Sequence, residues 1–182
     1  RDTDRSRGLG DVYKRQYNLP CLAYKYMAPG HNSALIDDDK MFLVYHQRFS
    51  TGNEGHELRV HQMLMNENGW PCVLPYEYTG ETVADGYKKD EVAGTYYMIK
   101  QDPNDNTSAV EYNAVALNDD GTLSGYLKGS WEMKDNSIYL SIKCGTATYQ
   151  GVICEMKDEA GTDCMAISLI GENNCSLLGV KY

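Results

Sequence analysis

Basic clusters, long hydrophobic runs and paired-cysteine motifs are all missing from this sequence of 182 residues. The net charge is −9, and an acidic surface repels phosphate backbones, so no nucleic-acid partner is expected. No apolar run approaches the length needed to span a bilayer, so no membrane partner is expected. Long amphipathic helical patterns are also missing, which points away from helical folds.

Cysteine is present six times but without a CxxC pair, which argues against a zinc ribbon or a redox motif. Four cysteines lie in the last 40 residues at intervals of roughly ten, as expected for one per strand in a β-domain: Cys144, Cys154, Cys164 and Cys175. Buried free thiols are the simplest interpretation. If the protein is secreted, a disulfide among these four is the alternative. The spacing does not say which cysteines would pair.

Phenylalanine is scarce, with only 2 residues, whereas tyrosine occurs 15 times. Tyrosine suits half-buried strands and carbohydrate-facing surfaces, because its ring is apolar while its hydroxyl stays hydrogen-bonded.

The first 16 residues differ from the rest of the chain. They hold four of the six arginines and show neither an apolar run nor a periodic pattern, so they predict neither a signal peptide nor a helix. Their end, DVYKRQ, resembles a translated sequencing-library adapter. We interpret residues 1–16 as non-native read-through; the alternative is a native disordered basic arm.

The remaining chain predicts an all-β protein with two parts. Short apolar runs at Ser33–Ile36, Met41–Gln47, Glu57–Met65 and Trp70–Tyr78 are separated by polar turns and fit about one blade of a β-propeller in residues 17–82. After a polar linker, a regular series of short strands begins at Gly94 and predicts a small closed β-barrel or sandwich within residues 83–182. One blade cannot bury both of its faces alone.

Two patterns that suggest metal chemistry fail on closer reading. His56, Glu57 and His61 resemble a zinc-protease motif, but the histidines are five residues apart and point to opposite faces of an alternating strand. The acidic run Asp37–Asp39 is better explained as a solvated hairpin turn than as a calcium site. Glu57 and Arg59 share a strand face, where a structural ion pair is expected.

The string APGHNS places His31 just after a Pro-Gly turn that enters an apolar strand. With FLVYHQRF, HELRVHQM and GWPCVLPYEYTGE, this string resembles the final propeller blade of glycoside hydrolase family 43 endo-1,5-α-L-arabinanases. The segments GTYYMIKQ, GSWEMKDNSIYLSI and TYQGVIC are similar to the C-terminal β-barrel of that family.

The resemblance implies a secreted enzyme that hydrolyses α-1,5-linked arabinan by inversion, with a five-bladed propeller before the barrel. The longer enzyme of which this chain would be the C-terminal part is called the parent here. The resemblance assigns His31 to a metal site near the propeller axis of the parent, and this site would hold calcium or another hard cation. The polysaccharide arabinan is then the partner of that parent, and a monomer is expected.

The catalytic residues of the family do not carry over. They are two aspartates and one glutamate from earlier blades, and five blades need roughly 200 residues or more. No carboxylate here matches them, so the catalytic set is expected upstream of Tyr17. The chain alone is expected to be inactive and to bind no metal. The His31 side chain is expected to be exposed to solvent. The alternative is a noncatalytic carbohydrate-binding or propeller-stabilising β-module.

Overall fold

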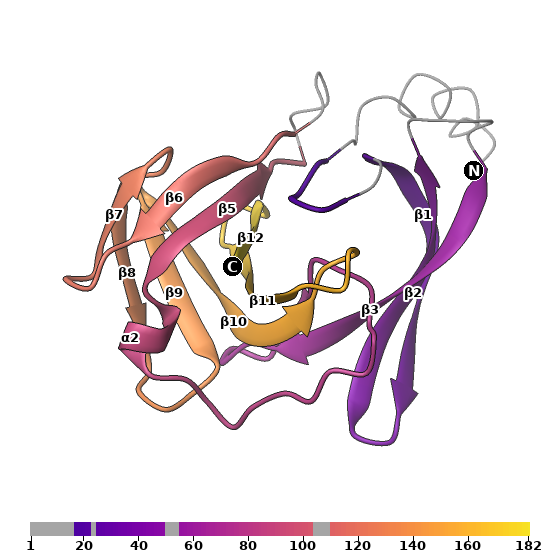
Figure 1. The fold of residues 1–182 in the computed structure, drawn as a ribbon, viewed down its shortest axis with the longest axis horizontal. Helices are drawn as coiled ribbons and strands as arrows, with labels where there is room; N and C mark the ends of the chain where they lie inside the picture. Colours follow the sequence, from indigo (N-terminus) through magenta and orange to yellow (C-terminus); the bar gives the residue numbers. More distant parts are fainter. Residues whose placement is uncertain (1–16, 23–24, 50–54, 104–109) are drawn as a thin grey trace.

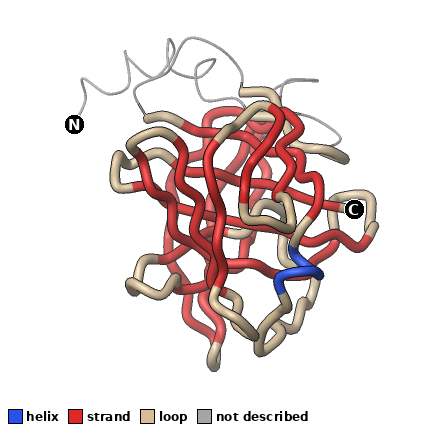
Figure 2. Tube along the Cα trace, turned by 90° about the vertical axis from the view of Figure 1, so that its left-hand side faces the viewer, coloured by secondary structure: helices blue, strands red, loops and turns tan. Residues whose placement is uncertain are grey.

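Short strands and tight turns dominate the computed structural model, which describes residues 17–22, 25–49, 55–103 and 110–182. Nearly all regular structure is strand, and one short helix, α2 (Lys89–Val92), follows the linker (Figure 2). The all-β prediction is therefore confirmed, although the sequence pattern missed this helical turn. Within the described residues, no helix has both the length and the apolar character needed to cross a membrane.

An antiparallel sheet of four strands, here called the N-terminal sheet, is formed by the first third of the described chain. Its order is β1-β2-β3-β4. The strands are β1 (Tyr26–Asp37), β2 (Lys40–Phe49), β3 (His56–Met65) and β4 (Pro71–Val73). The short, proline-bounded β4 lies at the edge, as predicted, because proline cannot donate to a sheet ladder.

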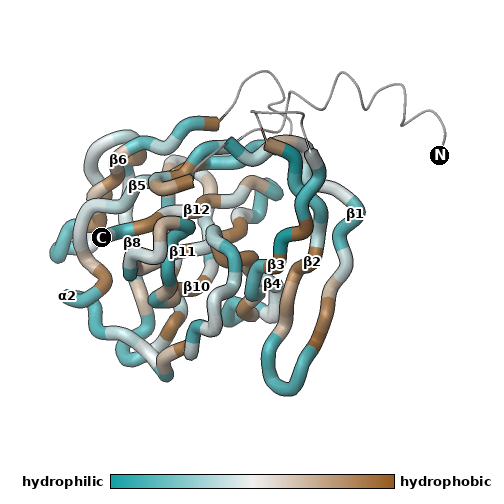
Figure 3. The backbone as a smooth tube through the Cα atoms, turned by 45° about the vertical axis from the view of Figure 1, so that its right-hand side comes forward, coloured by the Kyte–Doolittle hydropathy of each residue, from teal (hydrophilic) through white to brown (hydrophobic). Residues whose placement is uncertain are grey.

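The hairpin between β1 and β2 turns at Asp38 and Asp39, and its tip is hydrophilic (Figure 3). Asp38 takes a positive φ of 52°, a conformation that short polar residues tolerate in turns. The expected solvated turn is confirmed. β1, however, starts earlier than predicted: Pro29–His31 lie inside the strand at an irregularity, with register shifts on both sides of Gly30.

A closed barrel is formed by the other eight strands, in the order β10-β11-β12-β5-β6-β7-β8-β9. It stands beside the N-terminal sheet (Figure 1). The strands are β5 (Gly94–Gln101), β6 (Asn113–Leu117), β7 (Thr122–Gly125), β8 (Gly129–Met133), β9 (Tyr139–Cys144), β10 (Ala147–Lys157), β11 (Asp163–Gly171) and β12 (Ser176–Lys181). A predicted loop at Pro103–Asn106 lies mostly outside the described residues, and the domain boundary between residues 82 and 83 stays a prediction.

Large apolar side chains form the core of the barrel interior. Tyr96, Trp131, Ile142, Tyr149 and Ile167 belong to one continuous core, and each is at most 3% exposed. The Trp131 indole donates a hydrogen bond of 2.8 Å to the carbonyl oxygen of Asn118, so its polar atom is satisfied. This core gives the barrel its own source of stability.

A second core lies outside the barrel, between its outer wall and the N-terminal sheet. It joins Cys72, Leu74 and Tyr76 of the sheet side to Val152 and Ala166 of β10 and β11. Because β11 is covered on both faces, Cys164 to Leu169 form an unbroken buried run.

The cysteines are all described and all free. Four are buried: Cys72, Cys154, Cys164 and Cys175. The expectation of buried free thiols is confirmed for these four, whereas Cys21 is exposed and Cys144 is half-buried. Burial raises the pKa of the Cys72 thiol to about 12, so this group stays protonated and unreactive at neutral pH.

Candidate functional site

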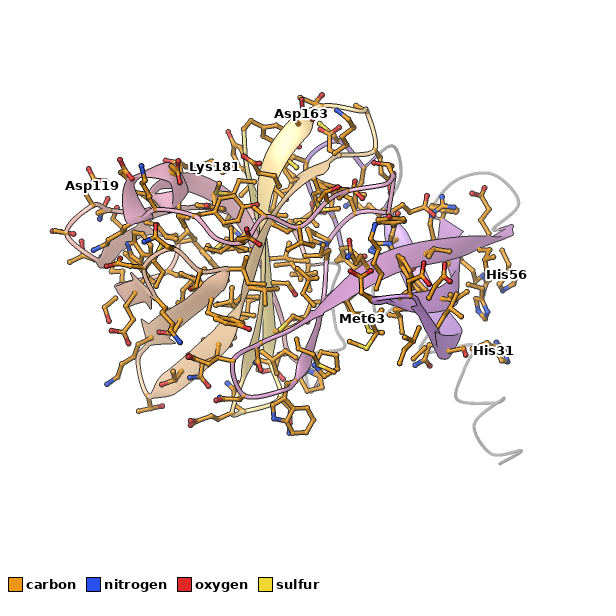
Figure 4. The ribbon with its side chains drawn as sticks, turned by 90° about the horizontal axis from the view of Figure 1, so that it is seen from below. His31, His56, Met63, Asp119, Asp163 and Lys181 are labelled. Carbon is orange, nitrogen blue, oxygen red and sulfur yellow. The ribbon has the colours of Figure 1, made fainter. Side chains whose placement is uncertain are left out.

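Three of the four histidines meet at one end of the exposed face of the N-terminal sheet. Nδ1 of His31 lies 3.1 Å from Nδ1 of His46. The ring centroids of His46 and His56 are 4.9 Å apart. His31 and His56 lie at the end of the molecule away from the barrel (Figure 4). We call His31, His46 and His56 the histidine cluster.

The hairpin register brings this cluster together. Gly30 pairs with His46, next to His31, whereas His46 pairs with Leu58 and Arg48 pairs with His56. His56 is therefore the diagonal neighbour of His46 on the same sheet face, within reach of its ring. His31 has φ of 49°, a left-handed backbone conformation that few non-glycine residues adopt. The irregular β1 backbone therefore turns the His31 ring toward His46.

The surroundings of His46 favour its neutral form. The pKa of His46 is lowered by partial burial first, and then by the neighbouring His56, His31 and Arg48. Between the two facing Nδ1 atoms, one nitrogen must donate and the other accept. The second ring nitrogen of His31 then stays available, since His31 is exposed as expected.

The histidine cluster does not by itself make a site for a hard cation. Calcium prefers six to eight oxygen ligands, whereas the groups that contact His31 are imidazoles. In the described parts of the chain, no group of three or more histidine, cysteine or acidic side chains has the geometry to hold a metal ion. His31 fits calcium only as one ligand among oxygen donors supplied by water or other residues.

The fourth histidine, His61, is separated from the cluster and buried, with 1% exposure. Its Nδ1 atom lies 2.7 Å from the Leu74 carbonyl oxygen, and its Nε2 atom lies 3.1 Å from the Tyr45 hydroxyl. Burial lowers the pKa of His61 to about 4, so the ring is neutral. His56 and His61 thus occupy opposite faces of β3, as the alternating pattern predicted.

The remaining charged residues singled out in the sequence have structural roles. Arg59 forms ion pairs with Glu57 at 3.0 Å and with Glu77 at 3.4 Å. Its guanidinium also lies 4.7 Å from the Phe49 ring centroid. The expected Glu57–Arg59 pair is confirmed. The exposed residues Asp37–Asp39 remain at the hairpin tip, away from the histidine cluster.

One contact between the sheet and the barrel involves ionisable groups that the sequence pattern did not reveal. The buried Tyr26 hydroxyl donates a hydrogen bond to the Glu159 carboxylate in the β10–β11 turn. Burial, the hydrogen bond to Glu159 and the charge of that carboxylate raise the pKa of Tyr26 well above its usual range. This bond joins β1 to the barrel across the second core.

A groove on the barrel was also not anticipated. Its volume is about 1010 Å³, and it lies between the linker with α2 and the ends of β10, β11 and β12. The residues that give it chemical character are Glu81, Glu91, Glu155, Lys157, Asp163, Lys181 and Tyr182. No local sequence signal marks this groove, because its walls come from segments that are far apart in the chain.

Comparison with known proteins accounts for this combination of sheet and barrel. Residues 75–179 match the C-terminal lipocalin-like domain of glycoside hydrolase family 43. The chain is 38% identical over 135 residues to the extracellular endo-α-(1→5)-L-arabinanase of Thermotoga petrophila, covering 72% of this chain and 28% of that protein. It is 33% identical over 159 residues to extracellular endo-α-(1→5)-L-arabinanase 2 of Bacillus subtilis, covering 86% of this chain and 34% of that protein.

Solved structures agree over both parts of the fold. The glycoside hydrolase family 43 YxiA protein from Bacillus licheniformis superposes with a TM-score of 0.84 at 31% identity, covering 91% of this chain and 38% of that chain. The endo-1,5-α-L-arabinanase from Thermotoga petrophila gives 0.80 at 30% identity, covering 87% of this chain and 36% of that chain. The present chain spans about a third of the length of these relatives. It belongs to glycoside hydrolase family 43, through its C-terminal lipocalin-like domain.

Proposed function

We propose that this chain is the C-terminal part of an extracellular enzyme that cleaves α-1,5-linked arabinan. The observation that carries the proposal is the extent of the structural likeness, because 87% of the chain superposes on one endo-arabinanase. Barrel strands alone cannot account for that coverage, so the N-terminal sheet is part of the match. The names of the two curated relatives support arabinan as substrate and an extracellular location.

In this proposal the N-terminal sheet is the last blade of a propeller. Leu35 and Leu58 are 50% and 66% exposed on the sheet, and Ile36 is 73% exposed. Exposed apolar side chains on one sheet are typical of a surface that another element covers. A preceding blade of the parent enzyme would supply that cover.

The catalytic carboxylates are proposed to lie in the parent, before Tyr17. Inverting hydrolysis needs a protonated carboxylic acid at the leaving oxygen and a carboxylate that activates water on the opposite face of the sugar. Glu57 and Glu77 are held by Arg59, and Asp37–Asp39 form a turn, so these acids have other roles. The present residues would support the propeller and position its last strands.

His31 is proposed to contribute one imidazole to a metal site of the parent, with calcium or another hard cation. A bound cation would favour the ionised forms of nearby catalytic carboxylates. His46 fixes the orientation of the His31 ring through the contact between their Nδ1 atoms. We propose a monomer for the parent, and the barrel as its accessory domain.

The test is to recover the intact open reading frame, express it and follow the hydrolysis of linear α-1,5-arabinan by reducing-sugar release. The proposal expects hydrolysis with inverted anomeric configuration in the first product. The proposal would be contradicted if the intact protein had no earlier propeller blades with catalytic aspartate and glutamate residues, or if it did not cleave linear arabinan. Either result would favour a noncatalytic module.

A further inference from the structure

The large groove on the barrel offers hydrogen-bond acceptors rather than free positive charge. Lys157 Nζ is paired with Asp163 Oδ1 at 2.6 Å. Lys181 Nζ donates to main-chain carbonyl oxygens at the end of α2, including that of Ala93 at 3.0 Å. Both ammonium groups of the groove are therefore already engaged by the protein.

Two carboxylates of the groove, those of Glu155 and Glu91, keep oxygens that accept no hydrogen bond from the described residues. Glu155 is exposed on β10, and among the described residues its carboxylate makes no hydrogen bond or ion pair. Glu91 receives one hydrogen bond of 2.7 Å, from the main-chain nitrogen of Lys88, to only one of its two oxygens. Glu81, in contrast, has both oxygens engaged, because it accepts from the main-chain nitrogen and hydroxyl of Thr79 and from the main-chain nitrogen of Lys157. An excess of carboxylate repels anionic ligands, which excludes uronate chains and nucleic acid.

Apolar surface lies beside these acceptors. Tyr87, Met156 and Met165 line the groove and are buried, with at most 9% exposure. The Tyr182 ring is 52% exposed at the rim, and its hydroxyl lies 3.4 Å from that of Tyr76. An exposed tyrosine ring can pack against a sugar face while carboxylates accept hydrogen bonds from sugar hydroxyls.

The groove is large and rigidly framed. Its volume of about 1010 Å³ is at the upper end of the range for small-molecule sites, so it has room for more than one sugar unit. Tyr87 accepts a 2.9 Å hydrogen bond from the Glu155 main-chain nitrogen and donates its own main-chain N–H to Ser137 at 3.1 Å. These bonds hold the linker wall against the barrel wall.

We propose that this groove is an accessory binding site for a neutral oligosaccharide, and that its ligand is a segment of arabinan. The ligand identity rests on the proposed function; the neutral, hydroxyl-rich chemistry follows from the groove itself. Asp163 and Lys181 mark the groove, and both lie away from His31 and His56 (Figure 4). The site would therefore hold polysaccharide apart from the histidine cluster.

The experiment maps amide chemical shifts of the present chain during titration with linear α-1,5-arabino-oligosaccharides. Shifts centred on Glu155, Asp163 and Tyr182 are expected. Glu155→Ala and Tyr182→Ala should each weaken binding by roughly tenfold, the loss expected for one charge-assisted hydrogen bond or one ring contact. Glu172→Ala is the matched control, because it removes an exposed carboxylate beyond the other end of β11 and should leave the affinity unchanged.

Two further ligands separate this inference from the proposed function. Groove shifts with a neutral xylo- or gluco-oligosaccharide, but not with arabino-oligosaccharides, would support the groove and contradict arabinan. Shifts with oligolysine alone, or saccharide shifts located elsewhere, would overturn the inference. The absence of any saccharide shift would overturn it as well, while leaving hydrolysis by the intact parent a separate question.

Discussion

His61 Nδ1 lies 2.7 Å from the carbonyl oxygen of Leu74, and this contact fixes the protonation of a buried ring. Nδ1 must carry the proton in order to donate to a carbonyl oxygen, so Nε2 is left to accept from Tyr45, 3.1 Å away. Both ring nitrogens are thereby satisfied in the neutral form. A second proton would break the bond from Tyr45 and place a charge in the core.

The first prediction follows from this lowered pKa. The unfolded chain takes up a proton near the usual histidine value of 6.5, whereas folded His61 does so only at about 4. The free energy of unfolding should fall as the pH drops through this interval, by at most about 1.4 kcal/mol per pH unit from this group. Above the usual value the contribution is fully present.

The measurement is urea unfolding between these pH values for the native chain and for His61→Asn, which keeps a donor toward Leu74. The variant should be less stable and should show a shallower pH dependence. Equal slopes for the two proteins would show that His61 is not the titrating group.

The second prediction concerns the bond between Tyr26 and Glu159 that joins the sheet to the barrel. Tyr26→Phe removes the hydroxyl and leaves the carboxylate without this donor, so we expect a loss of about 1–3 kcal/mol in unfolding free energy. Tyr126→Phe is the control, since Tyr126 is 59% exposed and should change little. A Tyr26→Phe variant as stable as the control would remove this bond from the account.

The third prediction is that residues 83–182 fold alone, whereas residues 17–82 do not. The barrel closes on itself around its own core, but the N-terminal sheet has open edges and draws much of its burial from the barrel wall. Amide exchange on the two separately expressed pieces is the measurement. Strong protection in a monomeric 17–82 piece would refute the idea.

The isolated barrel should also differ from the barrel in the whole chain. Val152, Ala166 and Val180 are buried against the sheet side, and removal of the sheet exposes them. We therefore expect the barrel piece to fold but to associate at high concentration.

The fourth prediction tests His31 in the intact parent. His31→Ala should lower both bound metal and arabinan turnover, because the ligand and its charge effect on the carboxylates are lost together. Metal analysis and activity are measured on the same sample. Leu58→Ala, also on the exposed sheet face, is the control for a general disturbance of the blade. Unchanged metal content and turnover would return His31 to a structural role.

Much of the fold was predictable because strand alternation and turn residues are local signals. The predicted strand Gly94–Gln101 has the observed bounds, and the Asp38–Asp39 turn is where composition indicated. The irregular β1 was missed, since a bulge depends on pairing with β2 rather than on local propensity. Helix α2 was missed because a turn of four residues leaves no periodic pattern.

The histidine cluster follows from the hairpin register, although no local sequence motif marks it. A two-residue hairpin loop at Asp38–Asp39 places His31 opposite His46 by register alone, apart from the shift at Gly30. That signal was available once the hairpin was accepted. The barrel groove was not predictable, because its walls come from the linker and three strand ends that only the closed barrel brings together.

The most direct test of the account is the activity of residues 17–182 alone on linear α-1,5-arabinan. The acid and base carboxylates are proposed to lie outside these residues, so the glycosidic barrier should stay near its uncatalysed height. Reducing-sugar release should equal the blank for this piece and rise well above it for the intact parent under the same conditions. Release above the blank by the purified piece would contradict the account.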